Sequence, residues 1–172
     1  MTLVIGDGEA IGTADWRIEC AGPQDRDALA ALFARCSAQS VRQRFFGRLG
    51  ALPLPYLDGA LAGPPELHDA VVGYGGDRTC LAGLASLVAE DPAGTSAELG
   101  VLVADACQRR GLGGAMMGVL LARARLRGVT RVTACVLPYR APLLAALGRR
   151  PELSLVDGGV TRDARTGVYE LR

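Results

Sequence analysis

A glycine-rich turn between two apolar segments constrains the fold of this chain more than any other feature. The turn reads Gln108-Arg109-Arg110-Gly111-Leu112-Gly113-Gly114, follows the apolar stretch 99–103 and precedes an alanine- and leucine-rich run over 115–126. This order predicts a strand, a tight turn and a helix. The first N–H groups of a helix lack intrahelical partners and lie at the positive end of its dipole, so they bind anions. Glycines leave that backbone open to close approach. We therefore expect a pyrophosphate site here.

Two common phosphate-binding motifs do not fit this turn. A P-loop needs a lysine after its second glycine, and all 19 basic residues of this chain are arginines. A dinucleotide-binding turn needs a third glycine where Met116 stands. Two alternatives stay open on the residues alone: a glycine-rich turn without a ligand, and an unrelated nucleotide-binding α/β domain.

The composition indicates one globular domain. The chain has 172 residues, of which 49% are hydrophobic and 22% charged, and its net charge is +1, so nothing in the bulk charge favours nucleic acid or a membrane surface. Its five scattered cysteines and single histidine (His68) do not have the spacing of a metal site, which predicts reduced thiols, no metal and a cytoplasmic protein. We expect a flexible tail over 1–15 and a single domain over 16–172.

Hydrophobic periodicity and turn residues give a coarse element order. We expect strands over 16–20, 70–74, 81–88, 97–103, 129–137, 153–156 and 167–171. Helices are expected over 25–35, 41–46, 115–127 and 143–147, with Ser40 as the N-cap of the second, and one helical turn near 56–57 in an otherwise irregular segment. A turn over 75–78 joins the second and third strands. This order predicts an α/β protein with a mixed sheet.

The turn resembles the Gln/Arg-x-x-Gly-x-Gly/Ala signature of the GNAT superfamily of N-acetyltransferases, with Gln108, Gly111 and Gly113 at the signature positions. The resemblance covers residues 16–171. It implies a mostly antiparallel central sheet of six to seven strands flanked by helices, in the order β-α-α-β-β-β-α-β-α-β-β. It also implies a bacterial acetyltransferase that uses acetyl-CoA as its co-substrate.

The same resemblance assigns the residues that hold acetyl-CoA. Gly100, in the middle of a strand, predicts a bulge that opens a gap for the pantetheine arm; packing of a small residue against the central helix is the alternative. Main-chain groups of Val101, Leu102 and Val103 would then hold pantetheine and the acetyl carbonyl. The pyrophosphate would be held by the backbone of Gln108, Arg109, Arg110, Gly111, Leu112, Gly113, Gly114 and Ala115.

Glu98 is the candidate general base. It is the one acid in the segment 97–103, and strand alternation puts it on the face of Gly100 and Leu102. We expect partial burial there, which suits a carboxylate to proton transfer; a solvated glutamate paired with an arginine is the alternative. In the protein-lysine branch of the superfamily an acid at this strand position is the proposed base.

The chain departs from the superfamily after its fifth strand. Many members have an asparagine there and, about eight residues later, a tyrosine that is the usual candidate acid for the CoA thiolate. Arg140 stands at the asparagine position, and no tyrosine follows before Gly148. Tyr139 is therefore the substitute candidate, with packing or surface exposure as its alternative role.

A second resemblance concerns the expected second helix. Its Ser40-x-x-x-Arg44-Phe45-Phe46 pattern is similar to the second helix of bacterial protein-lysine acetyltransferase domains, where it forms one wall of the acceptor groove. We expect Phe45 and Phe46 to pack inward and Arg42 or Arg44 to face the groove. Arg42 and Phe46 are the candidate substrate-binding residues; a plain amphipathic helix with solvated arginines is the alternative.

Several functions remain open. The leading one is an acetyl-CoA-dependent N-acetyltransferase that acts on a protein lysine, followed by one that acts on a small-molecule amine. The missing asparagine and tyrosine favour instead an acyl-CoA-binding module without turnover. A homodimer formed through an exposed C-terminal strand edge is also possible on this pattern.

Overall fold

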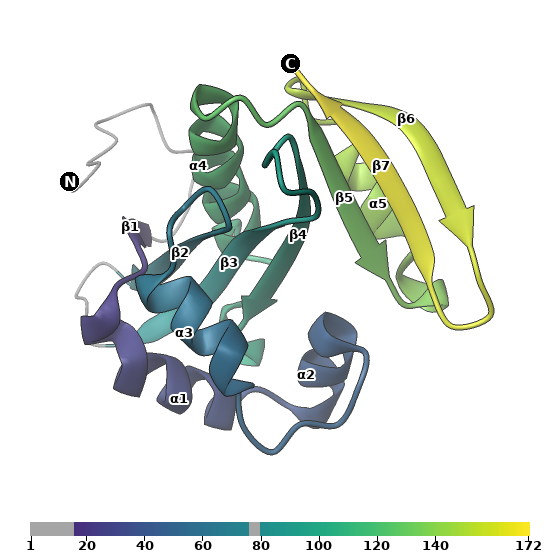
Figure 1. The fold of residues 1–172 in the computed structure, drawn as a ribbon. Helices are drawn as coiled ribbons and strands as arrows, with labels where there is room; N and C mark the ends of the chain where they lie inside the picture. The colour runs from purple at the N-terminus through teal and green to yellow at the C-terminus, as the bar shows by residue number, and fades with distance from the viewer. Residues whose placement is uncertain (1–15, 76–79) are drawn as a thin grey trace.

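Seven strands form one mixed sheet in the computed structural model, which describes residues 16–75 and 80–172 (Figure 1). The sheet order is β1-β2-β3-β4-β5-β7-β6, and every neighbouring pair is antiparallel except β4 and β5, which are parallel. The strands are β1 (Trp16–Cys20), β2 (His68–Gly75), β3 (Leu81–Ala89), β4 (Ser96–Val103), β5 (Arg131–Val136), β6 (Leu153–Val160) and β7 (Arg165–Leu171).

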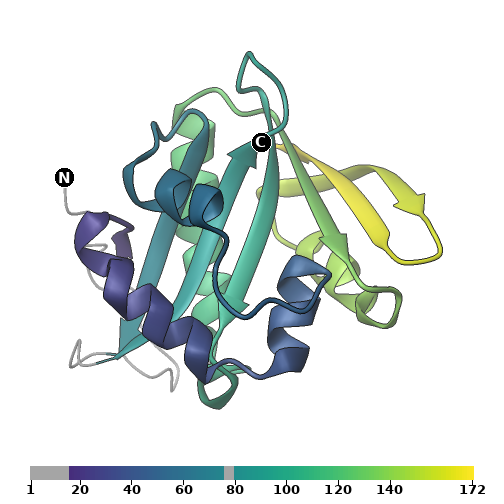
Figure 2. The same ribbon diagram turned by 60° about the horizontal axis from the view of Figure 1, so that its bottom comes forward.

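Helices cover both faces of this sheet. The helices α1 (Arg26–Arg35), α2 (Ala38–Phe45) and α3 (Leu54–Ala62) pack on one face, and α4 (Leu112–Leu126) and α5 (Pro142–Leu147) pack on the other (Figures 1 and 2). Three short 3-10 turns precede α1, α4 and α5: η1 (Pro23–Asp25), η2 (Asp105–Cys107) and η3 (Pro138–Arg140).

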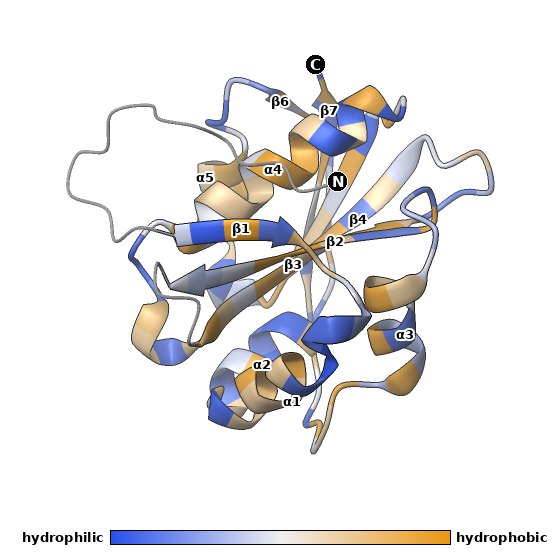
Figure 3. Cartoon of the chain, turned by 90° about the vertical axis from the view of Figure 1, so that its left-hand side faces the viewer, coloured by the Kyte–Doolittle hydropathy of each residue, from blue (hydrophilic) through white to orange (hydrophobic). Residues whose placement is uncertain are grey.

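Each face has its own hydrophobic core. One core joins α4 and α5 to the sheet through side chains such as Leu112, Met116 and Tyr169, and the other joins α1–α3 to the sheet through side chains such as Leu29, Leu32 and Leu84. The strands β2 and β3 are therefore buried over most of their length, and β3 is a nearly continuous apolar run. Figure 3 shows the predominantly hydrophobic α4, whereas α2 carries several hydrophilic residues.

A buried carboxylate fixes α4 to β2. The side chain of Asp69 is 3% exposed and accepts two hydrogen bonds from Arg123 at 2.9 Å (Nε to Oδ2 and Nη2 to Oδ1). Arg127, one helical turn later, contacts the same carboxylate at 2.7 Å. Two guanidinium groups thus compensate one carboxylate that lies out of reach of water.

The expected mixed α/β fold is confirmed, and the differences are local. The segment 49–65 contains the nine-residue helix α3 instead of one turn, because Pro53 and Pro55 lie at its start, where a proline removes no helical hydrogen bond. The second helix begins three residues earlier than expected: Ser37, not Ser40, is its N-cap and accepts a hydrogen bond from the Ser40 N–H at 3.2 Å. The expected tail over 1–15 and most of the turn over 75–78 lie outside the described residues. Within residues 16–75 and 80–172, no helix is long and apolar enough to span a membrane.

Candidate active site

The parallel strands β4 and β5 separate in the middle of the sheet. They pair only from Ser96 opposite Arg131 to Leu99 opposite Ala134, although β4 continues to Val103. Figure 1 shows β5 diverging from β4 with β6 and β7. The β5 side of β4 is therefore open over residues 100–103, next to the start of α4.

The gap does not come from the expected bulge at Gly100. The register between β3 and β4 is uninterrupted from Gly83 opposite Val103 to Ala89 opposite Ala97. Gly100 lies within this regular pairing, opposite Ser86, so the prediction of a bulge is wrong. The separation of β4 from β5 instead begins where their pairing ends, after Leu99.

The glycine-rich turn forms the predicted entry to α4. Gly111, at φ +85°, is the N-cap, and Arg109 also has a left-handed backbone at φ +58°. The N–H of Ala115 donates to the carbonyl of Gly111 at 3.0 Å and closes the first helical turn. The N–H groups available to an anion are consequently those of residues 112–114.

The side chain of Gln108 ties this turn to α2. Its Nε2 donates to the Val103 carbonyl and to Asp105 Oδ1, both at 3.1 Å, and to Ser40 Oγ at 2.9 Å. Asp105 in turn accepts hydrogen bonds from the Ser37 N–H at 2.6 Å and from the hydroxyl of Ser40. The Ser40 hydroxyl is the main reason that the pKa of Asp105 lies below its usual range. The glycine-rich turn and the N-terminus of α2 therefore form one hydrogen-bonded unit.

Two arginines of the turn have different surroundings. Arg109 lines the cleft, whereas the guanidinium of Arg110 lies over the ring of Trp16, 5.2 Å from its centroid. The Trp16 indole also donates to the Arg110 carbonyl at 3.0 Å. Arg110 thus fastens the turn to β1, and its side chain is not among those that line the cleft.

Arg150 is a cleft residue that the sequence interpretation missed. Its Nη1 donates to the Gly114 carbonyl at 3.2 Å, and its Nε lies 2.7 Å from Glu152 Oε1. A Cβ at Gly118 would lie 3.3 Å from Arg150 Nη2, so the glycines one turn apart on α4 make room for this guanidinium. In the sequence, the spacing of Gly114 and Gly118 was the signal that a large side chain packs against this face of α4.

These elements enclose a cleft of about 470 Å³. Of the residues predicted to hold acetyl-CoA, those lining it are Val101, Leu102, Val103, Gln108, Arg109, Gly111, Gly113 and Gly114, while Arg110, Leu112 and Ala115 do not. The side chain of Leu112 is buried in the core between α4 and the sheet.

Glu98 lies at the other end of the same cleft. Its side chain is exposed, which corrects the expected partial burial, because strand alternation turns it away from the core that buries its neighbours Ala97 and Leu99. This exposure agrees with the solvated glutamate of the alternative, but among the described residues Glu98 has no arginine as an ion-pair partner. Arg44 and Phe46 of α2 line the cleft with it.

The two phenylalanines of α2 have different roles. Phe45 packs among aromatic rings, 5.6 Å from Tyr56 between centroids. Phe46 ends the helix with a left-handed backbone, at φ +59°, and is 40% exposed, so the prediction that it packs inward is wrong. The left-handed conformation turns its side chain out of the helical row, and the ring lines the cleft as a candidate substrate contact.

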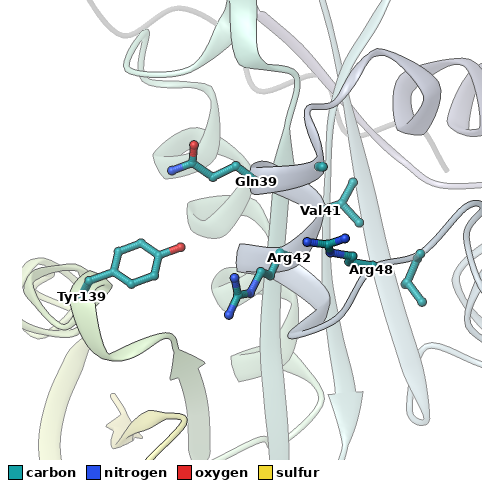
Figure 4. A pocket seen from close by; sticks show the side chains of 7 residues that line it. Gln39, Val41, Arg42, Arg48 and Tyr139 are labelled. Atoms are coloured by element: carbon teal, nitrogen blue, oxygen red, sulfur yellow. The ribbon is translucent and has the colours of Figure 1, made fainter.

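Tyr139 and Arg42 line a second pocket of about 600 Å³ on the other side of α2, together with Gln39, Arg48 and neighbouring apolar residues (Figure 4). Tyr139 is 59% exposed, and its hydroxyl lies 3.4 Å from Gln43 Nε2. The structure therefore separates Tyr139 from Glu98, whereas the adjacent Arg140 lines the cleft. Among the described residues, no group of three or more acidic, histidine or cysteine side chains could hold a metal ion.

Comparisons with known proteins agree with this geometry. Residues 28–148 match the model of the Acetyltransferase (GNAT) family. The fold is similar to the GNAT domain of S. lividans PAT (TM-score 0.78, 20% identity, 91% of this chain and 90% of that one). It is also similar to yncA from Salmonella typhimurium, a structure with its cofactor acetyl-CoA (TM-score 0.69, 18% identity, 91% and 93%).

A third similar structure is longer than this chain. A cAMP-binding acyltransferase from Mycobacterium smegmatis matches 91% of this chain over 44% of its own length, with a TM-score of 0.60 and 22% identity. Comparison with curated protein sequences finds no significant match. At these identities the structural similarities support the fold, while the family match covers more than half of the sequence. The chain belongs to the acetyltransferase (GNAT) family.

Proposed function

We propose that this protein transfers an acetyl group from acetyl-CoA to a primary amine of a protein lysine, with Glu98 as the general base. The observation that carries the proposal is the gap between β4 and β5, which leads from Glu98 to the free N–H groups at the start of α4. One end of this cleft suits proton transfer and the other suits an anion.

The donor end offers backbone donors and positive charge. The N–H groups of residues 112–114 point to a site for the diphosphate of acetyl-CoA, and Arg109 and Arg150 line the same end of the cleft. The open edge of β4 over residues 101–103 is suited to pairing with the amide groups of pantetheine. In yncA the same fold holds acetyl-CoA, which supports this assignment.

The acceptor end must remove a proton. A lysine-like amine has a pKa of about 10.4, so its neutral form at pH 7 costs roughly 4.6 kcal/mol. Glu98 is the only carboxylate among the described residues that line the cleft, and it is exposed enough to reach an entering amine directly or through one water.

The thiolate leaving group needs no tyrosine in this proposal. Among the described residues, none of those lining the cleft is a tyrosine. Tyr139 faces the neighbouring pocket, so we do not assign it the role of acid. A thiol pKa near 8.5 makes a CoA thiolate a tolerable leaving group that water can protonate.

The first test is a thermal-shift titration with acetyl-CoA, CoA and ATP. A ligand at 100 times its Kd stabilises the fold by about 2.7 kcal/mol, which is readily detected. We expect acetyl-CoA and CoA to raise the Tm of the wild type. Gly113→Trp should fold without this response, because its ring would fill the space beside Val101 and Val103. The matched control is Gly113→Ala, whose Cβ meets only ordinary contacts at 3.6 and 3.8 Å.

The second test measures thiol release with lysine peptides and small amines. We expect turnover by the wild type and a loss of about 10²-fold or more in kcat for Glu98→Gln at unchanged acetyl-CoA binding. Binding of acetyl-CoA without thiol release on any amine would instead support a binding module. Stabilisation by ATP but not by acetyl-CoA would overturn the assignment of the turn.

A further inference from the structure

Arg44 is a cation on the floor of the cleft that has only neutral partners. Its Nη2 donates to the Tyr56 hydroxyl at 3.2 Å and to Ser86 Oγ at 3.4 Å. Its guanidinium lies 4.7 Å from the centroid of the Phe45 ring and 5.3 Å from that of Tyr56. No ion pair among the described residues includes Arg44. A half-buried guanidinium held in place without a counter-charge is suited to bind an anion that arrives with the ligand.

The second pocket continues this positive surface. Arg42 and Arg48 line it from α2 and the segment that follows, and Tyr139 faces them from η3 (Figure 4). Among the described residues, none of those that line this pocket is acidic. Gln43 and Tyr139, whose polar atoms lie 3.4 Å apart, stand between this pocket and the cleft.

The two pockets together are strongly asymmetric in charge. Glu98 is the only acid among the described residues that line them. Arg109 and Arg150 lie at the phosphate end, and Arg150 is already paired with Glu152. The acceptor side therefore has an excess of arginines over acids, namely Arg42, Arg44 and Arg48.

We infer that the acceptor is a lysine in an acidic polypeptide segment. A carboxylate next to the lysine binds Arg44 in the cleft, and further acidic residues lie against Arg42 and Arg48 in the second pocket. A small amine that fills the cleft does not reach the second pocket, whereas a peptide passing α2 spans both. This inference rests on the proposed acetyltransferase activity.

The test compares lysine peptides that differ only in charge. One peptide carries aspartates on both sides of the lysine, and its partner carries asparagines at the same positions. We expect kcat/KM of the aspartate peptide to be at least about tenfold higher at low salt, and the ratio to shrink as ionic strength rises. Arg44→Gln and the double variant Arg42→Gln/Arg48→Gln should each reduce this ratio, mainly through KM. Arg44→Lys, which keeps the charge, should retain most of it.

The control is Arg125→Gln, which removes one exposed charge from α4 away from both pockets. It should leave the ratio unchanged. Acetyl-CoA thermal shifts establish that each variant is folded and binds the donor. Equal turnover of the two peptides, or a ratio that survives both arginine variants, would overturn the inference while leaving the proposed activity intact.

Small amines test whether the carboxylate that binds Arg44 belongs to a free amino acid instead of to a residue next to the lysine in a polypeptide. Amino acids and their carboxamides are assayed in the same way. A carboxylate preference that is confined to amino acids, and that depends on Arg44 but not on Arg42 and Arg48, would overturn the polypeptide acceptor. Absence of turnover on every amine, with acetyl-CoA still bound, would instead contradict the proposed function itself.

Discussion

The guanidinium of Arg44 occupies the space directly above Gly100, where any side chain at position 100 would lie. Gly100 is opposite Ser86 in the β3–β4 register, and Ser86 also contacts Arg44. The absence of a side chain at Gly100 therefore leaves the space in which the guanidinium of Arg44 from α2 lies. This relationship links the sheet to the acceptor side of the cleft.

The first prediction is that Gly100→Ala impairs acceptor binding more than folding. The new methyl group displaces Arg44, whose flexible end can move, so the cost in stability should stay near 1 kcal/mol. We expect KM for an aspartate-flanked lysine peptide to rise about tenfold, as for the loss of one charged hydrogen bond. Steady-state kinetics and urea unfolding measure the two effects. Gly50→Ala is the control, because nothing lies within 4 Å of a Cβ there.

The second prediction concerns Asp105, which joins the glycine-rich turn to α2. Removing its carboxylate in Asp105→Ala leaves the Ser37 N–H, the Ser40 hydroxyl and the Gln108 amide without this acceptor. We expect a loss of roughly 1–3 kcal/mol in the free energy of unfolding at pH 7, together with weaker acetyl-CoA binding. Chemical denaturation and acetyl-CoA titration test this.

The pH dependence of the Asp105 effect has a defined sign. Hydrogen bonds hold the pKa of Asp105 below its usual range in the folded protein. Its contribution is therefore present above about pH 4 and is lost as the pH falls through the folded pKa. The stability difference between wild type and Asp105→Ala should accordingly narrow in acid. A difference that stays constant down to the lowest accessible pH would contradict this account.

The third prediction is that Asp69→Asn is strongly destabilising. The change leaves Arg123 and Arg127 without their shared buried counter-charge, so we expect a loss of about 3–5 kcal/mol in the free energy of unfolding. Asp58→Asn is the matched control. The Asp58–Arg26 pair is exposed, with side-chain exposures of 61% and 47%, and its loss should cost under about 1 kcal/mol. Equal losses in urea unfolding would show that burial of Asp69 is not the cause.

The fourth prediction is a histidine-dependent loss of stability in mild acid. Burial first, and then the charge of Arg44, lowers the pKa of His68, which packs 5.0 Å from Tyr56 between ring centroids. The folded protein therefore favours the neutral ring. The stability contribution is present above the unfolded pKa of about 6.5 and declines as the pH falls from there toward the lower folded pKa.

His68→Gln should flatten this decline. His68 is the only histidine in the chain, so no other imidazole titrates in this window. The measurement is the free energy of unfolding by urea between pH 7.5 and the acid end of the window for wild type and variant. An unchanged slope in the variant would assign the decline to other groups.

Patterns of local origin were predicted well from the sequence. The glycine-rich turn, the helix after it and the apolar strands 81–88 and 97–103 depend on backbone freedom and on side-chain periodicity, and the structure places them within a few residues of expectation. The error at the start of the second helix involves a contact between residues far apart in the sequence. Ser37 and Ser40 are both acceptable caps, and the contact of Ser37 with Asp105, 68 residues away, accompanies the earlier helix start.

The composition of the cleft could not be predicted in the same way. The sequence alone determined that a strand leads through a glycine-rich turn into a helix and that Glu98 lies on the same strand face as Gly100, because both follow from neighbours along the chain. Only the tertiary structure decided that β5 leaves β4 after Leu99, that Arg44 lies over Gly100 and that Tyr139 lies outside the cleft. These positions depend on how distant elements pack, and packing between surfaces far apart in sequence is not encoded in the periodicity of either one.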